Sequence, residues 1–145
     1  MSDLTRRDLI RLIALGRPLL LEGVNLNFTD LSHLNLLEAR LNGASLRGAN
    51  LTGVFASAAS LLGTDLSHAL LNGCWLPQAM LMTADLTQAN LTNALLMGAN
   101  LEDARLEGAI LNGADLSGAS LSSEQLKQVL WDKKTKWPDG VRPPA

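Results

Sequence analysis

Cysteine, aromatic side chains and long apolar runs are all scarce in this chain. Cys74 is the only cysteine among 145 residues, and aromatic residues make up 3% of them. A single cysteine excludes an intramolecular disulfide and suits a reducing compartment, so we expect a cytoplasmic protein. No run of eighteen apolar residues occurs, which argues against a membrane-spanning helix. Arg11 and Arg17 interrupt the apolar segments near the start, so we expect no signal peptide.

A strong charge of either sign is also missing. The formal net charge is −2: residues 21–121 carry nine acids and three bases, whereas the first twenty and the last twenty-four residues are each +2. The few basic residues form no row that could follow a phosphate backbone. We therefore expect neither direct nucleic-acid binding nor a membrane partner. The 47% apolar composition indicates one globular unit.

Leucine, by contrast, recurs at every fifth position. From Leu21 to Leu121 there are twenty-one such sites, and all are Leu except Ala56. The site two residues before each of them is usually Ala. The larger or β-branched exceptions at this second site are Val24, Thr29, Leu34, Val54, Thr64 and Cys74.

A period of five fits neither a helix nor a continuous strand. A helix turns about 100° per residue, so leucines five apart would spread around its surface. A strand alternates with period two, so every second Leu would point to the wrong face. The chain must therefore turn a corner in every unit.

Glycine marks that corner, because ten of the twelve glycines lie two residues after the repeated Leu. The third residue of a type II turn needs a positive φ, which glycine adopts most readily. We expect the Ala and Leu of each unit to point inward, with the residue between them pointing outward. Coils of this kind stack about 4.8 Å apart through backbone hydrogen bonds.

Segments such as 49–53 (ANLTG), 84–88 (ADLTQ), 99–103 (ANLED) and 114–118 (ADLSG) resemble the A-(D/N)-L-X-X unit of pentapeptide repeat proteins. This resemblance implies an all-β solenoid, a right-handed quadrilateral β-helix with four units in each coil. The repeat would then form about five coils.

Both ends of the repeat have helical patterns. Residues 3–15 place Leu9, Leu12 and Ile13 on one face, before the stop signals Gly16 and Pro18. We expect an N-terminal capping helix and linker (1–20), the β-helix (21–121), and a C-terminal capping helix and tail (122–145). In an alternative reading, the basic amphipathic N-terminal helix docks on a membrane or a partner.

The expected C-terminal helix rests on two local signals. Ser122 and Gln125 have the spacing of a capping box, and Leu126, Val129 and Leu130 would form the apolar face. Short α-helical caps at both ends would cover the backbone that a solenoid otherwise exposes.

We find no constellation of residues that predicts catalysis, metal binding or a cofactor. His33 and His68 fall at outward corners on different faces, so they are not expected to share a site. Cys74 occupies an inward Ala site, where a small buried hydrophobe is favoured over a nucleophile. Asp65 and Asp85 would stack as a solvated ladder. We therefore predict a protein that is not an enzyme.

Large apolar residues at outward positions are the informative departure. With twenty residues in each coil, Phe55, Trp75 and Leu95 stack in one row, and other apolar residues flank them. Such one-sided patches often mark protein interfaces, although exposed apolar residues also occur without a partner. A local backbone shift at Ala56 could let Phe55 fill the missing Leu volume, which would shorten the patch. The predicted partner-binding face consists of Leu37, Phe55, Trp75, Pro77, Met80, Met82, Leu95 and Met97.

The leading functional prediction is a non-enzymatic protein-interaction scaffold, a monomer or weak homodimer with an unidentified protein partner. The alternative comes from the resemblance: some pentapeptide repeat proteins mimic duplex DNA and modulate or protect DNA gyrase and related topoisomerases. Those members are typically more acidic, often dimerise through one end and sometimes carry an inserted loop. This repeat has a net charge of only −6 and an unbroken register.

Overall fold

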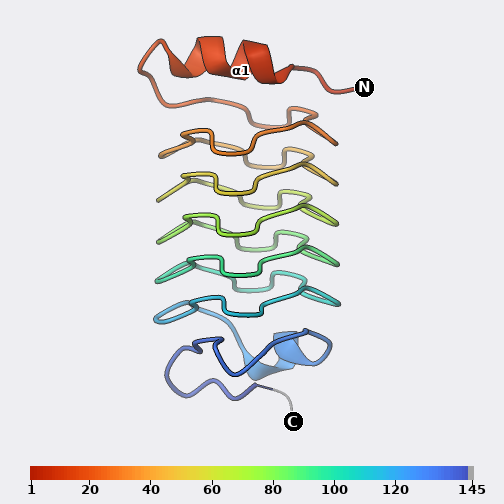
Figure 1. Ribbon diagram of the computed structural model, residues 1–145, viewed down its shortest axis with the longest axis vertical. Helices are drawn as coiled ribbons and strands as arrows, with labels where there is room; N and C mark the ends of the chain where they lie inside the picture. The colour runs from red at the N-terminus through yellow and green to blue at the C-terminus, as the bar shows by residue number, and fades with distance from the viewer. Residues whose placement is uncertain (144–145) are drawn as a thin grey trace.

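The computed structural model describes residues 1–143 as a rod of stacked coils, with helix α1 (Arg6–Ile13) lying across one end (Figure 1). Isolated parallel bridges join the coils, and every bridge except Asp115–Lys136 pairs an outward residue with the residue twenty positions later, as in Phe55 with Trp75. Twenty residues are four five-residue units, so the coil has four sides. The ladder runs from the Leu20–Arg40 bridge to the Asp115–Lys136 bridge.

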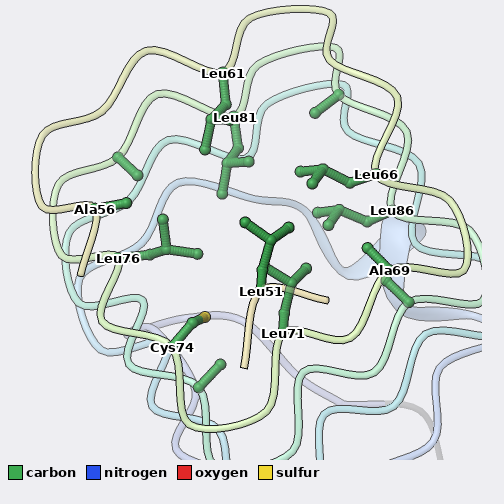
Figure 2. Packing of buried hydrophobic residues seen from close by; sticks show 14 of the residues in the cluster. Leu51, Ala56, Leu61, Leu66, Ala69, Leu71, Cys74, Leu76, Leu81 and Leu86 are labelled. Atoms are coloured by element: carbon green, nitrogen blue, oxygen red, sulfur yellow. The ribbon is translucent and has the colours of Figure 1, made fainter. Parts of the chain in front are cut away.

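The inward assignment of the Leu and Ala sites is confirmed. The repeated leucines from Leu21 to Leu116 are each at most 4% exposed, Ala56 is 2% exposed, and only Leu121 at the end of the series is half-buried. The alanines two residues earlier are also buried, so each coil adds a layer of Leu and Ala to one continuous core (Figure 2). This burial is the main driving force for stacking the coils.

The corners are turns with a positive φ at the third residue, as expected. In a typical unit the Ala44 N–H donates to the Leu41 carbonyl at 2.9 Å, and Gly43 has a φ of 64°. Residues other than glycine also adopt this conformation, and Phe28 has a φ of 58°. The ring of Phe28 lies over Gly48 in the next coil, where a Cβ atom would come within 2.5 Å of it. A side chain at residue 48 would therefore need the exposed ring of Phe28 to move, and the positive φ favours glycine there.

Threonine is tolerated in the inward Ala site when its hydroxyl finds a carbonyl. The Thr64 hydroxyl donates to the Leu41 carbonyl at 2.8 Å, and the Thr135 hydroxyl donates to the Leu111 carbonyl at the same distance. Thr29 is also buried, but its hydroxyl has no hydrogen-bond partner among the described residues. The reason is positional, because α1 replaces the coil that would supply the carbonyl.

This difference predicts opposite effects for the same substitution. Thr29→Val should raise the free energy of unfolding by about 1 kcal/mol, since it removes an unpaired buried hydroxyl and keeps the side-chain shape. Thr64→Val should lower it by about 1 kcal/mol, since it removes a satisfied hydrogen bond. Thermal or urea unfolding of the two variants measures both changes. Equal shifts of the same sign would contradict the assignment.

Helix α1 begins at a capping box and closes the N-terminal end of the core. The Asp8 N–H donates to the Thr5 hydroxyl at 3.3 Å, and the Thr5 N–H donates to the Asp8 carboxylate at 2.9 Å. Leu9 is fully buried, while Leu12 and Ile13 pack partly buried against the core. Asp3 supplies hydrogen-bond partners to the backbone at the open edge of the first coil. Its N–H donates to the Asn25 carbonyl at 2.7 Å, and its carboxylate accepts from the Asn25 N–H at 2.8 Å.

If α1 stabilises the rod, its buried and exposed faces should respond differently to truncation. Leu9→Ala should lower the free energy of unfolding by about 2 to 5 kcal/mol, the usual cost of emptying a fully buried Leu site. The neighbouring Ile10 is 47% exposed, so Ile10→Ala should change it by less than about 1 kcal/mol. Thermal unfolding followed by circular dichroism checks both values. A Leu9→Ala variant as stable as the wild type would refute this role of α1.

The expected C-terminal α-helix is wrong. Only the 3₁₀ turn η1 (Ser123–Leu126) forms, although the Ser122 N–H does donate to the Gln125 side chain at 2.8 Å as the spacing predicted. After this turn the chain rejoins the ladder through the Leu130–Ile110 bridge, which leaves Leu130 59% exposed. The open edge of the preceding coil offers backbone hydrogen-bond partners and an apolar surface to pack on. These interactions outweigh the local preference for a helix.

The last coil is a degenerate continuation of the repeat. Leu126 and Val129 are buried at the sites of an inward Leu and an inward Ala, twenty residues after Leu106 and Ala109. Between the bridges that end at Leu130 and Lys136 the spacing grows from twenty to twenty-one residues. Thr135 is buried, and Trp131 and Trp137 form a T-shaped pair with ring centroids 5.9 Å apart. Two indoles therefore occupy the region where the regular repeat would place leucines.

Candidate interaction face

The predicted partner-binding residues lie together on the rod, and we call this set the apolar face: Leu37, Phe55, Trp75, Pro77, Met80, Met82, Leu95 and Met97. Consecutive bridges join Phe55 to Trp75 and Trp75 to Leu95, so these three side chains stack one coil apart. Phe55 is 53% exposed and Trp75 is 42% exposed. Leu95 is half-buried.

The remaining members flank this row. Leu37, Pro77 and Met97 lie at the corner that follows it. The polar residue Ser57 stands between Leu37 and Pro77 at this corner, and its hydroxyl donates to the Pro77 carbonyl at 3.3 Å. Met80 lies on the next side of the rod, in the row that the Ser60–Met80 and Met80–Asn100 bridges define. Leu37 and Met80 are exposed, whereas Pro77, Met82 and Met97 are half-buried. Met82 follows Leu81 as Pro77 follows Leu76, so it lies at the next corner. The apolar face therefore covers parts of two sides and of the corner that follows each.

Elsewhere on the rod, the outward mid-unit residue is often Asp or Asn for a local reason. Its side-chain oxygen accepts from the backbone N–H two residues later, as between Asn50 and Thr52 at 3.1 Å and between Asn90 and Thr92 at 3.0 Å. Trp75 cannot supply this acceptor, and the residue two positions later is Pro77, which has no N–H to satisfy. Trp75 can therefore stand where other units have Asp or Asn, because this turn has no N–H that would lose its acceptor.

The suggested backbone shift at Ala56 does not occur. The Phe55 N–H donates to the Leu34 carbonyl at 3.0 Å and the Ala56 N–H donates to the Trp75 carbonyl at 2.8 Å, as at equivalent sites of other coils. Phe55 points outward and Ala56 stays buried. Leu34 and Val54, both larger than the usual Ala, add volume on the same side of the core. The apolar face thus retains Phe55.

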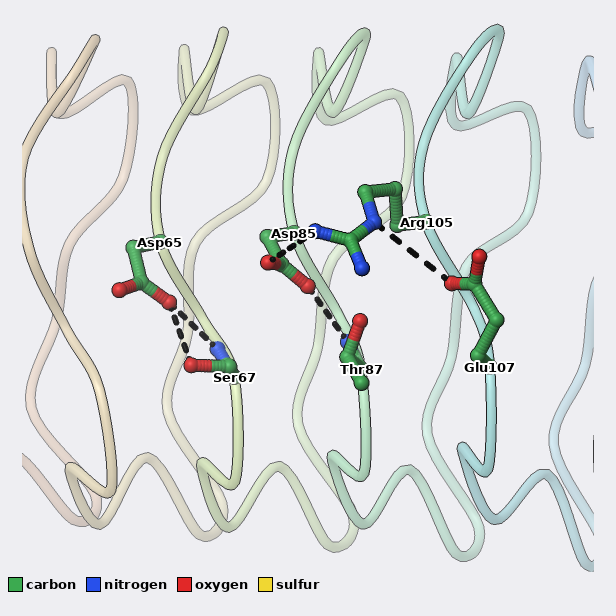
Figure 3. Close-up of polar contacts among 6 residues, drawn as sticks. All are labelled: Asp65, Ser67, Asp85, Thr87, Arg105 and Glu107. Carbon is green, nitrogen blue, oxygen red and sulfur yellow. Dashed lines mark hydrogen bonds and ion pairs between the residues drawn. The ribbon is translucent and has the colours of Figure 1, made fainter.

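The opposite side of the rod is polar (Figure 3). The Asp65 carboxylate accepts from the Ser67 N–H at 3.0 Å and from its hydroxyl at 2.6 Å. Arg105 donates to Asp85 at 3.1 Å. Partial burial raises the pKa of Asp85, but the hydrogen bond from the Thr87 N–H at 2.9 Å and the charge of Arg105 outweigh it, and the net shift of this pKa is downward. These carboxylates accept hydrogen bonds that hold turns.

The remaining chemically capable side chains are isolated. Cys74 is fully buried, and desolvation raises the pKa of its thiol to about 12, so the reactive thiolate is suppressed at neutral pH. The His33 ring lies over Gly53 and fills a corner. Within residues 1–143 no three His, Cys, Asp or Glu side chains gather where they could hold a metal ion. No helix in the same range is long and apolar enough to cross a membrane.

Several exposed apolar residues lie outside the predicted set. The exposure of Leu70, which is 44% exposed, could be predicted because it occupies an outward position of the repeat. The exposure of residues at the two ends could not, because their positions depend on how the chain enters and leaves the ladder. The largest of these exposed side chains are Ile10, Leu15, Leu20, Phe28, Leu130 and Trp131.

Comparison with protein families matches a model described as pentapeptide repeats, in eight copies, at residues 20–55, 59–98 and 99–123. The chain belongs to the pentapeptide repeat family. Proteins of this family form right-handed quadrilateral β-helices, in agreement with the four-sided coil seen here. A search of curated proteins finds no match.

Solved structures of the same kind are similar to this chain. A pentapeptide repeat protein of the Arabidopsis thaliana thylakoid lumen is 32% identical over 72% of this chain and 73% of its own, with a TM-score of 0.47. Rfr23 from the cyanobacterium Cyanothece 51142 is 32% identical over 90% of this chain and 97% of its own, with a TM-score of 0.38. QnrB1, a plasmid-mediated fluoroquinolone resistance protein, is 17% identical over 86% of this chain and 82% of its own, with a TM-score of 0.50, and this likeness concerns the fold alone.

Proposed function

We propose that this protein is a non-enzymatic interaction scaffold whose apolar face binds a protein partner. The observation that carries the proposal is the stacked row of Phe55, Trp75 and Leu95, at sites where the unit elsewhere favours Asp or Asn. Aromatic and Met side chains are enriched at the centres of protein interfaces, where burial of a few of them supplies most of the binding energy.

The rigidity of the surface favours this use. Each residue of the row donates its N–H to the preceding coil, as Trp75 does to the Val54 carbonyl at 2.8 Å and Leu95 to the Cys74 carbonyl at 2.9 Å. Side chains fixed on such a backbone lose little conformational entropy when a partner binds. The buried thiol of Cys74 and the turn-holding carboxylates of the polar side offer no pair of groups suited to catalysis, which supports a binding role.

The proposal predicts that Trp75→Asn abolishes partner binding and leaves the fold intact. Asn is a regular residue at this site of the unit, so the melting temperature should change by only a few degrees. Ser45→Asn is the matched control, because Ser45 occupies the same site on the opposite side of the rod. Affinity capture with quantitative mass spectrometry, followed by titration of the captured protein, measures the difference. A partner that binds all three proteins equally would refute the role of the apolar face.

The same variants distinguish self-association from binding to a different protein. Light scattering across a concentration series would reveal a homodimer, and loss of the dimer in Trp75→Asn alone would identify the partner as a second copy of this chain.

DNA mimicry and topoisomerase binding form the second candidate, suggested by the family and by the fold of QnrB1. A DNA mimic needs dense negative charge along its sides, but here Arg40 pairs with Glu22 at 2.8 Å and Arg105 pairs with Asp85. Arg47 adds a further positive charge to the polar side. Charge complementarity therefore disfavours this candidate.

We accordingly predict that the purified protein neither inhibits DNA gyrase nor protects it from fluoroquinolones at low micromolar concentration. Supercoiling and cleavage-complex assays test this directly. Clear inhibition or protection that survives Trp75→Asn would reverse the order of the two candidates.

A further inference from the structure

The outer surface at the N-terminal end of the rod has a composition different from that of the apolar face. We call it the tip: Arg7, Ile10, Arg11, Leu15 and Arg17. Arg7, Ile10 and Arg11 are three or four residues apart on α1, on the side away from the buried Leu9, and all five members of the tip are exposed. Helix α1 lies across the end of the stack (Figure 1), and Arg7, Ile10 and Arg11 lie on its exposed side, because Leu9 is buried. Leu15 and Arg17 belong to the segment that follows α1, where Arg17 lines a pocket with Leu37 and Glu38.

The positive charge of the tip is not neutralised within the described part of the chain. Arg6 pairs with Asp30 at 3.5 Å, but Arg7, Arg11 and Arg17 form no ion pair among residues 1–143. Asp3 accepts from the Asn25 N–H, and Asp8 accepts from Thr5 at the helix cap. The hydrogen bonds from Thr5 and the nearby charges of Arg11 and Arg7 lower the pKa of Asp8, but neither arginine forms an ion pair with it. Three arginines are therefore available to an anionic partner.

The tip also exposes aliphatic side chains beside these arginines. Ile10 is 47% exposed and Leu15 is 69% exposed, and Leu20 next to them is 64% exposed. A hollow of about 230 Å³ opens there, lined mainly by leucines together with Arg17 and Pro18. A surface that combines cations with protruding aliphatic groups needs a partner that supplies both anions and an apolar phase.

We propose that the tip docks on an anionic lipid membrane, so that the rod stands upright on the surface. Lipid phosphates and carboxylates would pair with Arg7, Arg11 and Arg17, while Ile10 and Leu15 enter the interface between headgroups and acyl chains. Nucleic acid offers the phosphates but no apolar phase for these side chains. The sequence predicts no membrane partner but leaves an alternative in which the basic N-terminal helix docks on a membrane, and the fold gathers at that end three arginines without ion pairs in the range 1–143. This inference goes beyond the proposed function and does not depend on it.

The test is sedimentation of the full chain with vesicles of phosphatidylcholine containing about one quarter phosphatidylserine, compared with vesicles of phosphatidylcholine alone. We expect binding to the anionic vesicles only, weakened by salt. A basic residue near an anionic surface contributes about 1 kcal/mol, about fivefold in partitioning, so the triple variant R7Q/R11Q/R17Q should bind about 100-fold more weakly. The double variant I10S/L15S should also bind more weakly, at low as well as high salt.

The matched control is K133Q/K134Q/R142Q, which removes the same charge from exposed sites near the other end of the chain. It should bind like the wild type, and unchanged melting temperatures should show that all variants are folded. Equal weakening of the two triple variants would overturn the proposal, since binding would then follow net charge alone. Equal binding to neutral vesicles, or binding to duplex DNA or an acidic polypeptide but not to anionic vesicles, would overturn it as well.

Discussion

The parallel bridge between outward residues twenty positions apart, made by backbone hydrogen bonds between residues nineteen and twenty-one apart, is the constraint on which the rest of the structure depends. It holds only if the chain returns to the same angular position after four units, so each unit must turn its corner with the same geometry. The positive φ of Gly43 and of Phe28 at the third turn residue meets this need. Once the corners are fixed, the inward Leu and Ala sites fall into columns, and hydrophobic burial along these columns stabilises the same register.

This constraint leaves the outward sites free to vary, which separates folding from recognition in the sequence. Many outward sites meet the demand of the N–H two residues later, as Asn50 does by accepting from Thr52. At Trp75 the demand disappears, because Pro77 has no N–H. A large indole can therefore stand on the surface without disturbing the backbone. The same separation makes substitution at outward sites a clean probe of binding, since stability changes little.

Most of the fold could be predicted from the sequence because its period is local, and the failures lie where long-range contacts decide. Ser122 and Gln125 form their expected side-chain contact, yet no helix follows, because the open edge of the preceding coil captures Leu130. The unpaired hydroxyl of Thr29 could not be predicted from the sequence either, since it depends on α1 replacing a coil. The stacking of Phe55, Trp75 and Leu95 followed from the five-residue period together with the four units per coil that the family resemblance implies. The half-burial of Leu95 did not, because it depends on the packing of neighbouring side chains.

The two ends show why a solenoid of one repeat can still have distinct surfaces. A coil ladder is polar: each end offers different backbone groups, so different structures must close them. At the N-terminal end Asp3 and α1 close the edge, which uses Asp3 and Asp8 as hydrogen-bond acceptors and leaves Arg7 and Arg11 exposed. At the other end the chain closes the edge with a degenerate coil, where Lys136 pairs with Asp115 at 2.9 Å. Hydrogen bonds from Ser117, together with this ammonium, hold the pKa of Asp115 below its ordinary value. The closing of the ladder thus decides which charges are neutralised and which remain available to a partner.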